Sequence, residues 1–441
     1  MKRISLIFIL TISIVAFFLY NKFNYEKTLN EINNIVLEMF GGESYKFSLD
    51  KLYVRLPRDK DRNIFNLNKY KRLEDFEYLI NYLKKSFMYW DYLNEKENIS
   101  KKVKHTKKLI KYAKNDLEYF YIIKNFILSL DNLGHISLIS SFRQFQDYKS
   151  NFTDVEYKKE WFNKFNNNLS NKNYLKLKYI YDSDNLSNLN FYYLEDNLIT
   201  KKLLYDTCYI RIKSFDRNYL NQDKIKINNL YKDLNNFKNL VIDLRGNTGG
   251  TTNYTYYLIN QLLNEDKSVK FNFLYKNSRE NISYIQSLIK SGIFYGSKED
   301  INKEIEVPIK YMKDENIKGT IFNFELKDKY EDILDLKKYK FNGKIYILTD
   351  KLNYSAAEFF IYVSKKLKFA TIVGNKTLGD GVAFEPSFFT LPNSGLIIRY
   401  SLLYGLNPDG SSNGIYGTKP DIDVGNKDAL EVVMELIKKD A

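Results

Sequence analysis

The sequence predicts an α/β protein, because two apolar runs in its second half each stop at a turn and resume as a helical pattern. The first run, Asn239–Leu244, is typical of a buried strand, and the run 254–263 that follows its turn has helical spacing. The second run, Lys344–Thr349, is followed by a short loop and a helical run over 355–367. Both junctions place glycine or polar residues where a strand ends, which is a common position for a functional site.

Residues 1–23 predict a membrane anchor or a signal segment. Met1-Lys2-Arg3 precedes Ile4 to Tyr20, a run of seventeen residues without a charge. The flank over 16–23 lacks the small-x-small pattern of a cleavage site, which favours an uncleaved anchor. The basic start would then stay cytoplasmic and the body of the chain would lie outside the cytoplasm. A secreted protein is the alternative.

The rest of the chain divides by pattern into four further segments. Residues 24–139 have helical spacing, shown best by Leu73–Leu83, and predict a helical N-terminal region. Residues 140–204 are rich in Asn, Lys and Tyr and predict a small inserted β-rich or mixed segment. Residues 205–425 form the predicted core, and 426–441 a C-terminal helix docked on that core.

Composition excludes several classes of function. With 441 residues and 44% hydrophobic content, the chain can bury a large core in two or three domains. The net charge of +14 (68 minus 54) is spread along the chain, so we expect no nucleic-acid partner. One cysteine, Cys208, cannot form an internal disulfide. No Cys/His metal spacing and no phosphate-binding glycine loop occurs, so we expect neither a metal nor a cofactor.

Ser355 is the first candidate for chemistry. It would lie at a helix N-terminus, where free N–H groups and the helix dipole favour an anion beside its hydroxyl. The closely spaced Gly249 and Gly250 could likewise present N–H groups to a developing oxyanion. The alternative is structural, since Ser355 with Glu358 three residues later is also the pattern of a helix capping box.

Several segments in order resemble the tail-specific (C-terminal processing) and tricorn-like serine peptidases. The matching segments are Val241–Gly250, Ser355–Glu358, Thr371–Gly381, Leu391–Gly395 and Gly417–Ile422. The resemblance covers about Tyr205 to Val424, with a weaker match over 131–138. It implies a crotonase- and ClpP-like core and peptides or unfolded protein tails as substrates. It also implies Ser355 as nucleophile and an oxyanion hole made by the Ala356 N–H and a backbone N–H of Gly249 or Gly250.

The general base divides this family. The tail-specific branch carries a lysine in the glycine turn after the nucleophile helix, where this chain has Asp380. Lys376 is an alternative, but its ammonium would need burial to lose a proton near neutral pH. The tricorn-like branch uses a histidine in an Asp-Gly-His-Thr type of element, which Asp131–Ser137 resembles. Of the two histidines, His105 lies among lysines, so the resemblance implies His135 as the base.

The residue that orients the histidine is not identified by the sequence. Tricorn-like enzymes carry a late glutamate before the Gly-x-x-Pro-Asp element, and this chain has none between Asp409 and Pro420. Asn413, Asp380, Glu385 and Asp409 are the candidates, although aspartates in such turns are usually structural. The missing glutamate leaves open a catalytically weak or inactive relative that binds peptides at the cell envelope.

Overall fold

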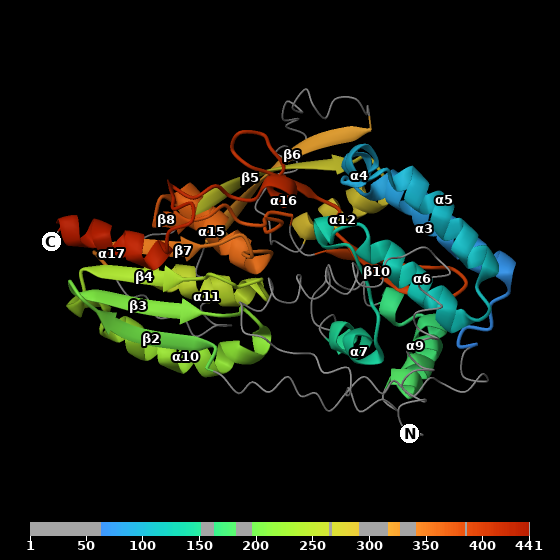
Figure 1. Ribbon diagram of the computed structural model, residues 1–441, viewed down its shortest axis with the longest axis horizontal. Helices are drawn as coiled ribbons and strands as arrows, with labels where there is room; N and C mark the ends of the chain where they lie inside the picture. The colour runs from blue at the N-terminus through green and yellow to red at the C-terminus, as the bar shows by residue number, and fades with distance from the viewer. Residues whose placement is uncertain are drawn as a thin grey trace, which may run out of the picture. The chain divides into compact units, whose positions relative to one another are not determined.

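The computed structural model describes residues 63–150, 163–181, 196–263, 267–290, 316–326, 341–383 and 386–440. Its first part is helical, as the periodic pattern predicts (Figure 1). The helices there are α3 (Lys69–Ser86), α4 (Trp90–Glu97), α5 (Ile99–Tyr112) and α6 (Asp116–Leu128), followed by the short 3-10 helix η3 (Leu133–His135). This helical part leads the chain directly to His135.

A six-stranded sheet is the centre of the described α/β core, with strand order β12-β8-β7-β4-β3-β2. Its strands are β2 (Leu198–Leu203), β3 (Thr207–Ile212), β4 (Asn239–Asp243), β7 (Lys344–Thr349), β8 (Thr371–Gly374) and β12 (Ile422–Asp423). Neighbouring strands are parallel except that β2 runs antiparallel to β3 at the edge. The fold class predicted from the sequence is therefore confirmed.

Helices cover this sheet because its central strands are apolar on both faces. Every residue of β4 is buried. The helices are α10 (Arg217–Lys232), α11 (Thr252–Leu262), α15 (Ala356–Leu367) and α17 (Ala429–Asp440), and α11 packs against both α10 and α15. The C-terminal helix α17 packs Val433 and Ile437 against Val241 and Leu348. Parallel strands then end at one edge of the sheet, where ligands usually bind.

Two smaller sheets accompany the central one. One has the order β11-β5-β6, with β5 (Lys267–Lys276), β6 (Ile317–Leu326) and β11 (Tyr404–Leu406). The other has the order β1-β10-β9, with β1 (Ser137–Leu138), β9 (Ser387–Thr390) and β10 (Ile397–Tyr400). The pairing of β1 with β10 fixes the backbone two residues after His135, because Ser137 lies opposite Arg399.

The described residues of the inserted segment 140–204 fit the mixed alternative rather than the β-rich one. They form α7 (Phe142–Ser150), α9 (Asn168–Tyr181) and the edge strand β2. The aromatic rings of the two helices pack inward, and Phe145 stacks on Tyr174 with ring centroids 4.5 Å apart. The remaining helices are α12 (Arg279–Lys290) and α16 (Asn413–Tyr416).

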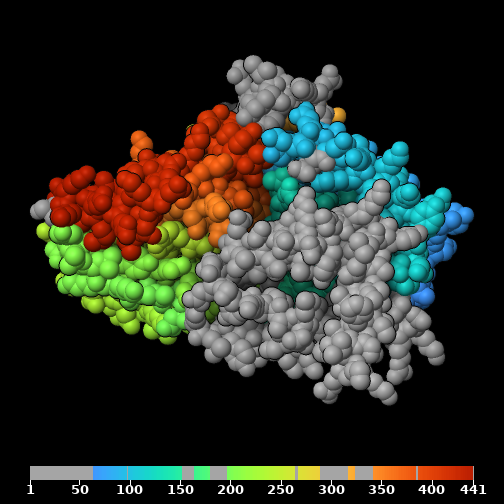
Figure 2. Space-filling model, viewed as in Figure 1, coloured from blue at the N-terminus to red at the C-terminus, as the bar shows by residue number. Residues whose placement is uncertain are grey.

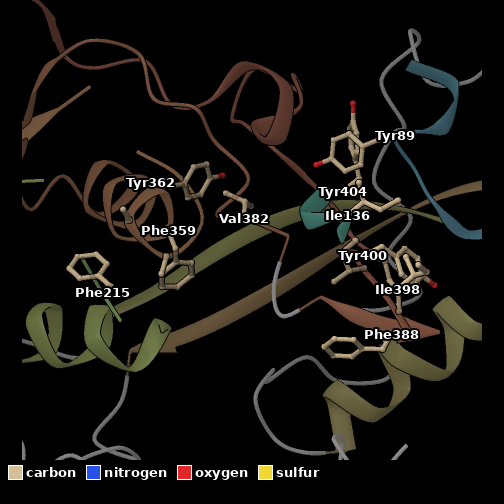
Figure 3. Packing of buried hydrophobic residues seen from close by; sticks show 14 of the residues in the cluster. Tyr89, Ile136, Phe215, Phe359, Tyr362, Val382, Phe388, Ile398, Tyr400 and Tyr404 are labelled. Carbon is tan, nitrogen blue, oxygen red and sulfur yellow. The ribbon is translucent and has the colours of Figure 1, made fainter. Parts of the chain in front are cut away.

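One large core of buried aromatic and aliphatic side chains extends through the described part of the chain. Figure 3 shows two of its groups, in which labelled aromatic residues from distant segments lie together. The labelled residues are Phe215, Phe359, Tyr362 and Val382 in one group, and Tyr89, Ile136, Tyr400, Tyr404, Ile398 and Phe388 in the other. In Figure 2 the C-terminal residues (red) adjoin the N-terminal helices (cyan), in agreement with the contacts of α16 with η3.

The predicted anchor, residues 1–23, lies outside the described residues. Within the described ranges, none of the helices combines the length and apolarity required to cross a bilayer.

Candidate active site

Ser355 lies in the turn between β7 and α15 and has an unusual backbone conformation. Its φ is 55° and its ψ is −122°, and its N–H donates to the Gly379 carbonyl at 3.1 Å. The Ser355 hydroxyl makes no capping hydrogen bond to the helix, and the Glu358 N–H reaches the Tyr354 carbonyl instead. The capping box that the sequence allowed is therefore not formed. The hydroxyl faces the His135 imidazole, with Oγ 2.8 Å from Nε2.

His135 ends the 3-10 helix η3 and is buried, with 5% of its surface exposed. Its φ is 54°, and Gly134 before it has a φ of 57°. The Gly134 carbonyl accepts from the Ser401 N–H at 2.7 Å, which ties this loop to the segment after β10. These constraints hold the imidazole between α15 and the glycine turn after β8.

Asp380 lies on the other side of the imidazole from Ser355. Its Oδ2 is 2.9 Å from His135 Nδ1 and accepts the His135 backbone N–H at 3.0 Å. The ring N–H does not point along the line to the carboxylate, so the Nδ1 contact is close in distance but bent. A bent contact still places the negative charge beside the ring, where an imidazolium would form.

Two tyrosines also donate to the Asp380 carboxylate. The Tyr354 hydroxyl donates to Oδ2 at 2.9 Å, and the Tyr89 hydroxyl to Oδ1 at 3.3 Å. Burial, together with the nearby Asp380 charge, raises the pKa of both phenols well above its usual value. Both hydroxyls therefore keep their protons at neutral pH and act as donors.

The glycine turn after β4 lies against Ser355. A Cβ built on Gly249, whose φ is +104°, would come within 2.9 Å of the Ala356 nitrogen and of Ser355 Cβ. Only glycine leaves this space open. The Gly249 N–H already donates to Asn247 Oδ1 at 2.8 Å. The N–H groups of Gly250 and Ala356, in contrast, have no acceptor within the described part of the chain.

The hydrogen bonds of Asn353 connect the two loops of the site. Its buried Nδ2 donates to the carbonyls of Leu244 and Asn247, and its backbone oxygen accepts from Leu378 and Gly379. The glycine turn, the Ser355 turn and the Asp380 turn are therefore held at fixed separations. No sequence pattern indicates this role, because Asn353 is simply an asparagine in a loop.

The other candidates for the orienting residue do not contact His135 among the described interactions. Asn413 donates to Glu358 Oε1, and its Oδ1 accepts the Gly381 N–H at 3.2 Å. Asp409 is exposed and accepts from the Ser411 N–H within its own turn. Glu385 lies outside the described residues. Asp380 is thus the only one of the four that the described structure brings to the imidazole.

The two alternatives to His135 as the base lie on the surface. Lys376 and His105 are both exposed. Lys376 makes no contact with Ser355 among the described interactions, so the described structure does not support it as the base. His105 lies on α5, away from the contacts of Ser355.

Glu358, one turn into α15, is a second buried carboxyl near the site. Its Oε1 accepts from Asn413 and Thr418, while Oε2 has no partner in the described residues. Burial raises the pKa of Glu358 to about 7, and the charge of Asp380 adds to this effect. The neighbouring polar side chains of Thr377, Thr418 and Asn413 act in the opposite direction. Glu358 connects α15 to the turn that carries Asp380 through Asn413, which also accepts the Gly381 N–H.

Sequence reasoning missed the two tyrosines around Asp380. Tyr354 is visible only as the residue before the candidate nucleophile, and Tyr89 lies 291 positions from its partner. Neither position has a composition or spacing that marks a donor to a carboxylate. No group of acidic, His and Cys side chains with the geometry of a metal site occurs in the described ranges.

Comparison with known proteins identifies a family from the part of the chain that follows the inserted segment. Residues 206–424 match the model of peptidase family S41. No curated protein matches the chain significantly.

Among solved structures, mature CPAF in complex with lactacystin is 13% identical, with a TM-score of 0.48 and coverage of 84% of this chain and 97% of that one. A lipoprotein from Streptococcus agalactiae is 14% identical, with a TM-score of 0.43 and coverage of 84% and 97%. The photosystem II D1 C-terminal processing protease is 16% identical, with a TM-score of 0.32 and coverage of 49% and 42%.

Proposed function

The chain belongs to peptidase family S41, whose members are serine peptidases, and we propose that Ser355, His135 and Asp380 form its catalytic triad. One observation carries the proposal. The His135 ring lies between the other two side chains, with Nε2 2.8 Å from Ser355 Oγ and Nδ1 2.9 Å from Asp380 Oδ2. A nucleophile, a base and a group that orients the base require this order.

In the proposed reaction, Nε2 of His135 accepts the hydroxyl proton as Ser355 Oγ attacks the carbonyl carbon of the scissile peptide bond. The carbonyl oxygen becomes an oxyanion, and the N–H groups of Ala356 and Gly250 donate to it. The imidazolium then gives its proton to the leaving amine nitrogen, the C–N bond breaks, and an ester to Ser355 remains. Water attacks this ester with His135 again as base, which releases the acid and restores the serine.

We assign the oxyanion role to Gly250 rather than Gly249 for a structural reason. The Gly249 amide is already satisfied by Asn247, whereas Gly250 is exposed and its amide has no acceptor in the described residues. Gly249 contributes open space beside Ala356 instead.

The position of Asp380 supports a replacement for the missing late glutamate. The sequence left open an inactive peptide-binding relative because no acid was identified for the imidazole. A buried carboxylate next to Nδ1 supplies that acid from a different turn. We therefore propose an active enzyme of the histidine-base type, with peptides or unfolded protein segments as substrates.

Covalent labelling tests this proposal without knowledge of the natural substrate. A fluorophosphonate probe places its phosphoryl oxygen in the oxyanion hole while the base removes the serine proton, so the wild-type protein should label at neutral and mildly alkaline pH. Ser355→Ala should abolish labelling, and His135→Ala should reduce it strongly. His105→Ala is the matched control and should label like the wild type, because that histidine is exposed on α5.

A folded wild-type protein that resists the probe would favour the inactive peptide-binding relative. Labelling that survives His135→Ala but is lost in Lys376→Ala would replace the histidine base with a lysine.

We further propose that residues 1–23 anchor the chain in a membrane with its catalytic region outside the cytoplasm. The support is the uncharged run Ile4 to Tyr20 behind Met1-Lys2-Arg3. The full-length chain should stay with membranes after a salt wash, which would screen a merely electrostatic attachment. It should also be digested by protease added outside intact cells. Recovery of a soluble mature chain that begins near residue 24 would favour secretion instead.

A further inference from the structure

Tyr354 contacts every member of the proposed triad, although the reaction assigns it no step. It precedes Ser355 directly, and its carbonyl accepts the Ala357 N–H at the start of α15. Its phenol ring lies against the His135 imidazole, with ring centroids 4.9 Å apart and planes tilted by 34°. Its hydroxyl donates to Asp380 Oδ2 at 2.9 Å.

The same hydroxyl also holds the loop that carries His135. It lies 3.1 Å from the Asn132 carbonyl and accepts from Asn132 Nδ2 at 3.3 Å. A phenol has one proton, and the carboxylate of Asp380 is the stronger acceptor, since hydrogen bonds to ionised groups are about twice as strong as neutral ones. The hydroxyl therefore joins the Asp380 turn to the 131–135 loop.

Asp380 needs such a support because its contact with the imidazole is bent. The Nδ1–H does not form a well-aligned hydrogen bond to the carboxylate, so other donors must fix the position of Oδ2. The Tyr354 hydroxyl and the His135 backbone N–H are the two donors, at 2.9 and 3.0 Å, that reach this oxygen. Tyr89 reaches the other oxygen, and only at 3.3 Å.

We propose that Tyr354 is a positioning residue that holds the Asp380 carboxylate beside the imidazole and orients the ring by packing against it. This inference rests on the proposed triad. It predicts that Tyr354 acts through Asp380, so the effects of changing the two residues are not independent.

A double-mutant cycle tests the coupling with fluorophosphonate labelling rates. Tyr354→Phe keeps the ring and removes the hydroxyl, and we expect labelling about tenfold slower or more, the effect of losing one charge-assisted hydrogen bond. In an Asp380→Asn background the same change should alter the rate by less than about twofold. Tyr362→Phe is the matched control on α15, because its buried hydroxyl donates to Leu406 rather than to Asp380, and it should label like the wild type.

The histidines provide a second readout that does not depend on labelling. The chain has two, so ¹⁵N-histidine gives separate ring signals for His135 and for the internal control His105. Tyr354→Phe should shift the His135 ring signals, whereas Tyr362→Phe should shift neither histidine. The urea midpoint of each variant reports any loss of fold in the same samples.

The outcomes separate the two proposals. A wild-type protein that does not label, or a Ser355→Ala variant that does, overturns the triad itself. If those controls behave and the defects of Tyr354→Phe and Asp380→Asn multiply, the positioning role of Tyr354 is wrong. Unchanged His135 ring signals in Tyr354→Phe would also contradict it.

Discussion

Replacement of Asp380 by asparagine removes a charge from the site while the structure can keep its shape. Oδ2 accepts two hydrogen bonds, from the Tyr354 hydroxyl and the His135 backbone N–H, so the amide oxygen must take that position. The amide NH₂ then faces the Tyr89 hydroxyl, which can accept a hydrogen bond. Asp380→Asn should therefore fold, and its defect should come from the missing charge beside the imidazolium.

The size of that defect follows from the distance between the groups. The closest atoms are 2.9 Å apart, which places the two charge centres near 4 Å, where opposite charges attract by about 4 kcal/mol at an effective dielectric constant of 20. At about 1.4 kcal/mol per tenfold, labelling should slow by about 10³. His135→Ala should cost more, since removal of the base in another serine peptidase costs about 10⁶.

The assay is the fluorophosphonate labelling rate at mildly alkaline pH, with the urea midpoint measured on the same protein. Asp409→Asn is the matched control, because this aspartate is exposed in its own turn, and it should label at the wild-type rate. Wild-type labelling by Asp380→Asn, or a larger loss in Asp380→Asn than in His135→Ala, would refute the assignment of roles.

Two further predictions concern the surroundings of the triad. Gly249→Ala should slow labelling by about 10²–10³, because its Cβ would lie 2.9 Å from the Ala356 nitrogen. Gly246 also has a positive φ (+79°, against +104° for Gly249), but an added Cβ there would meet nothing within 4 Å, so Gly246→Ala should label normally. Equal loss in both variants would assign the effect to backbone strain. Glu358→Gln should remove a pH dependence of stability: the pKa of Glu358 rises from 4.5 unfolded to about 7 folded, so the folded state binds the proton more tightly. Protonation of Glu358 contributes fully to the free energy of unfolding below about pH 4.5, and this contribution is lost as the pH rises to about 7. The free energy of unfolding should then decrease by about 3 kcal/mol. Urea unfolding should show this decrease for the wild type and not for Glu358→Gln. Parallel pH profiles for the two proteins would contradict the raised pKa.

The elements around the site were predictable because their apolar runs are long and end at clear turns. The run Asn239–Leu244 became β4, Lys344–Thr349 became β7, and the helical run behind Ser355 became α15. Burial on both faces makes such strands nearly continuous in apolar residues, so the signal is local. The pairing of Ser355 with His135, in contrast, came from the order of the family's motifs and not from any periodicity.

The orienting residue was not predictable, because two turns that are distant in sequence compete for the same place. Asn413 was a reasonable candidate from its position before the Gly-x-x-Pro-Asp element. In the structure its amide NH₂ donates to Glu358, and its amide oxygen accepts the Gly381 N–H. These bonds fix the turn next to Asp380. The sequence contained both residues, but only the structure shows that Asp380 lies beside the imidazole while Asn413 bonds to Glu358 and Gly381.

The inserted segment shows a different limit. Its Tyr- and Asn-rich composition suggested strands as readily as helices, because aromatic residues favour half-buried sheet surfaces. The described residues form α7 and α9 instead, where Phe145 and Tyr174 stack in a shared aromatic layer with Phe165. Tertiary packing of large rings here outweighed their local preference.

Backbone strain at the site is a feature that no sequence pattern predicted. Ser355, His135 and Asp380 all have a positive φ, at 55°, 54° and 61°, although none of them is glycine. Such conformations cost roughly 1–3 kcal/mol each and persist only where surrounding structure enforces them. Here the enforcing contacts are the ones that also bring the three side chains together: Ser355 N–H to the Gly379 carbonyl, and His135 N–H to Asp380. A fold selected for stability alone would place glycine or asparagine at these positions. Three strained residues that meet through their side chains therefore favour a site kept for chemistry over a retained but idle groove.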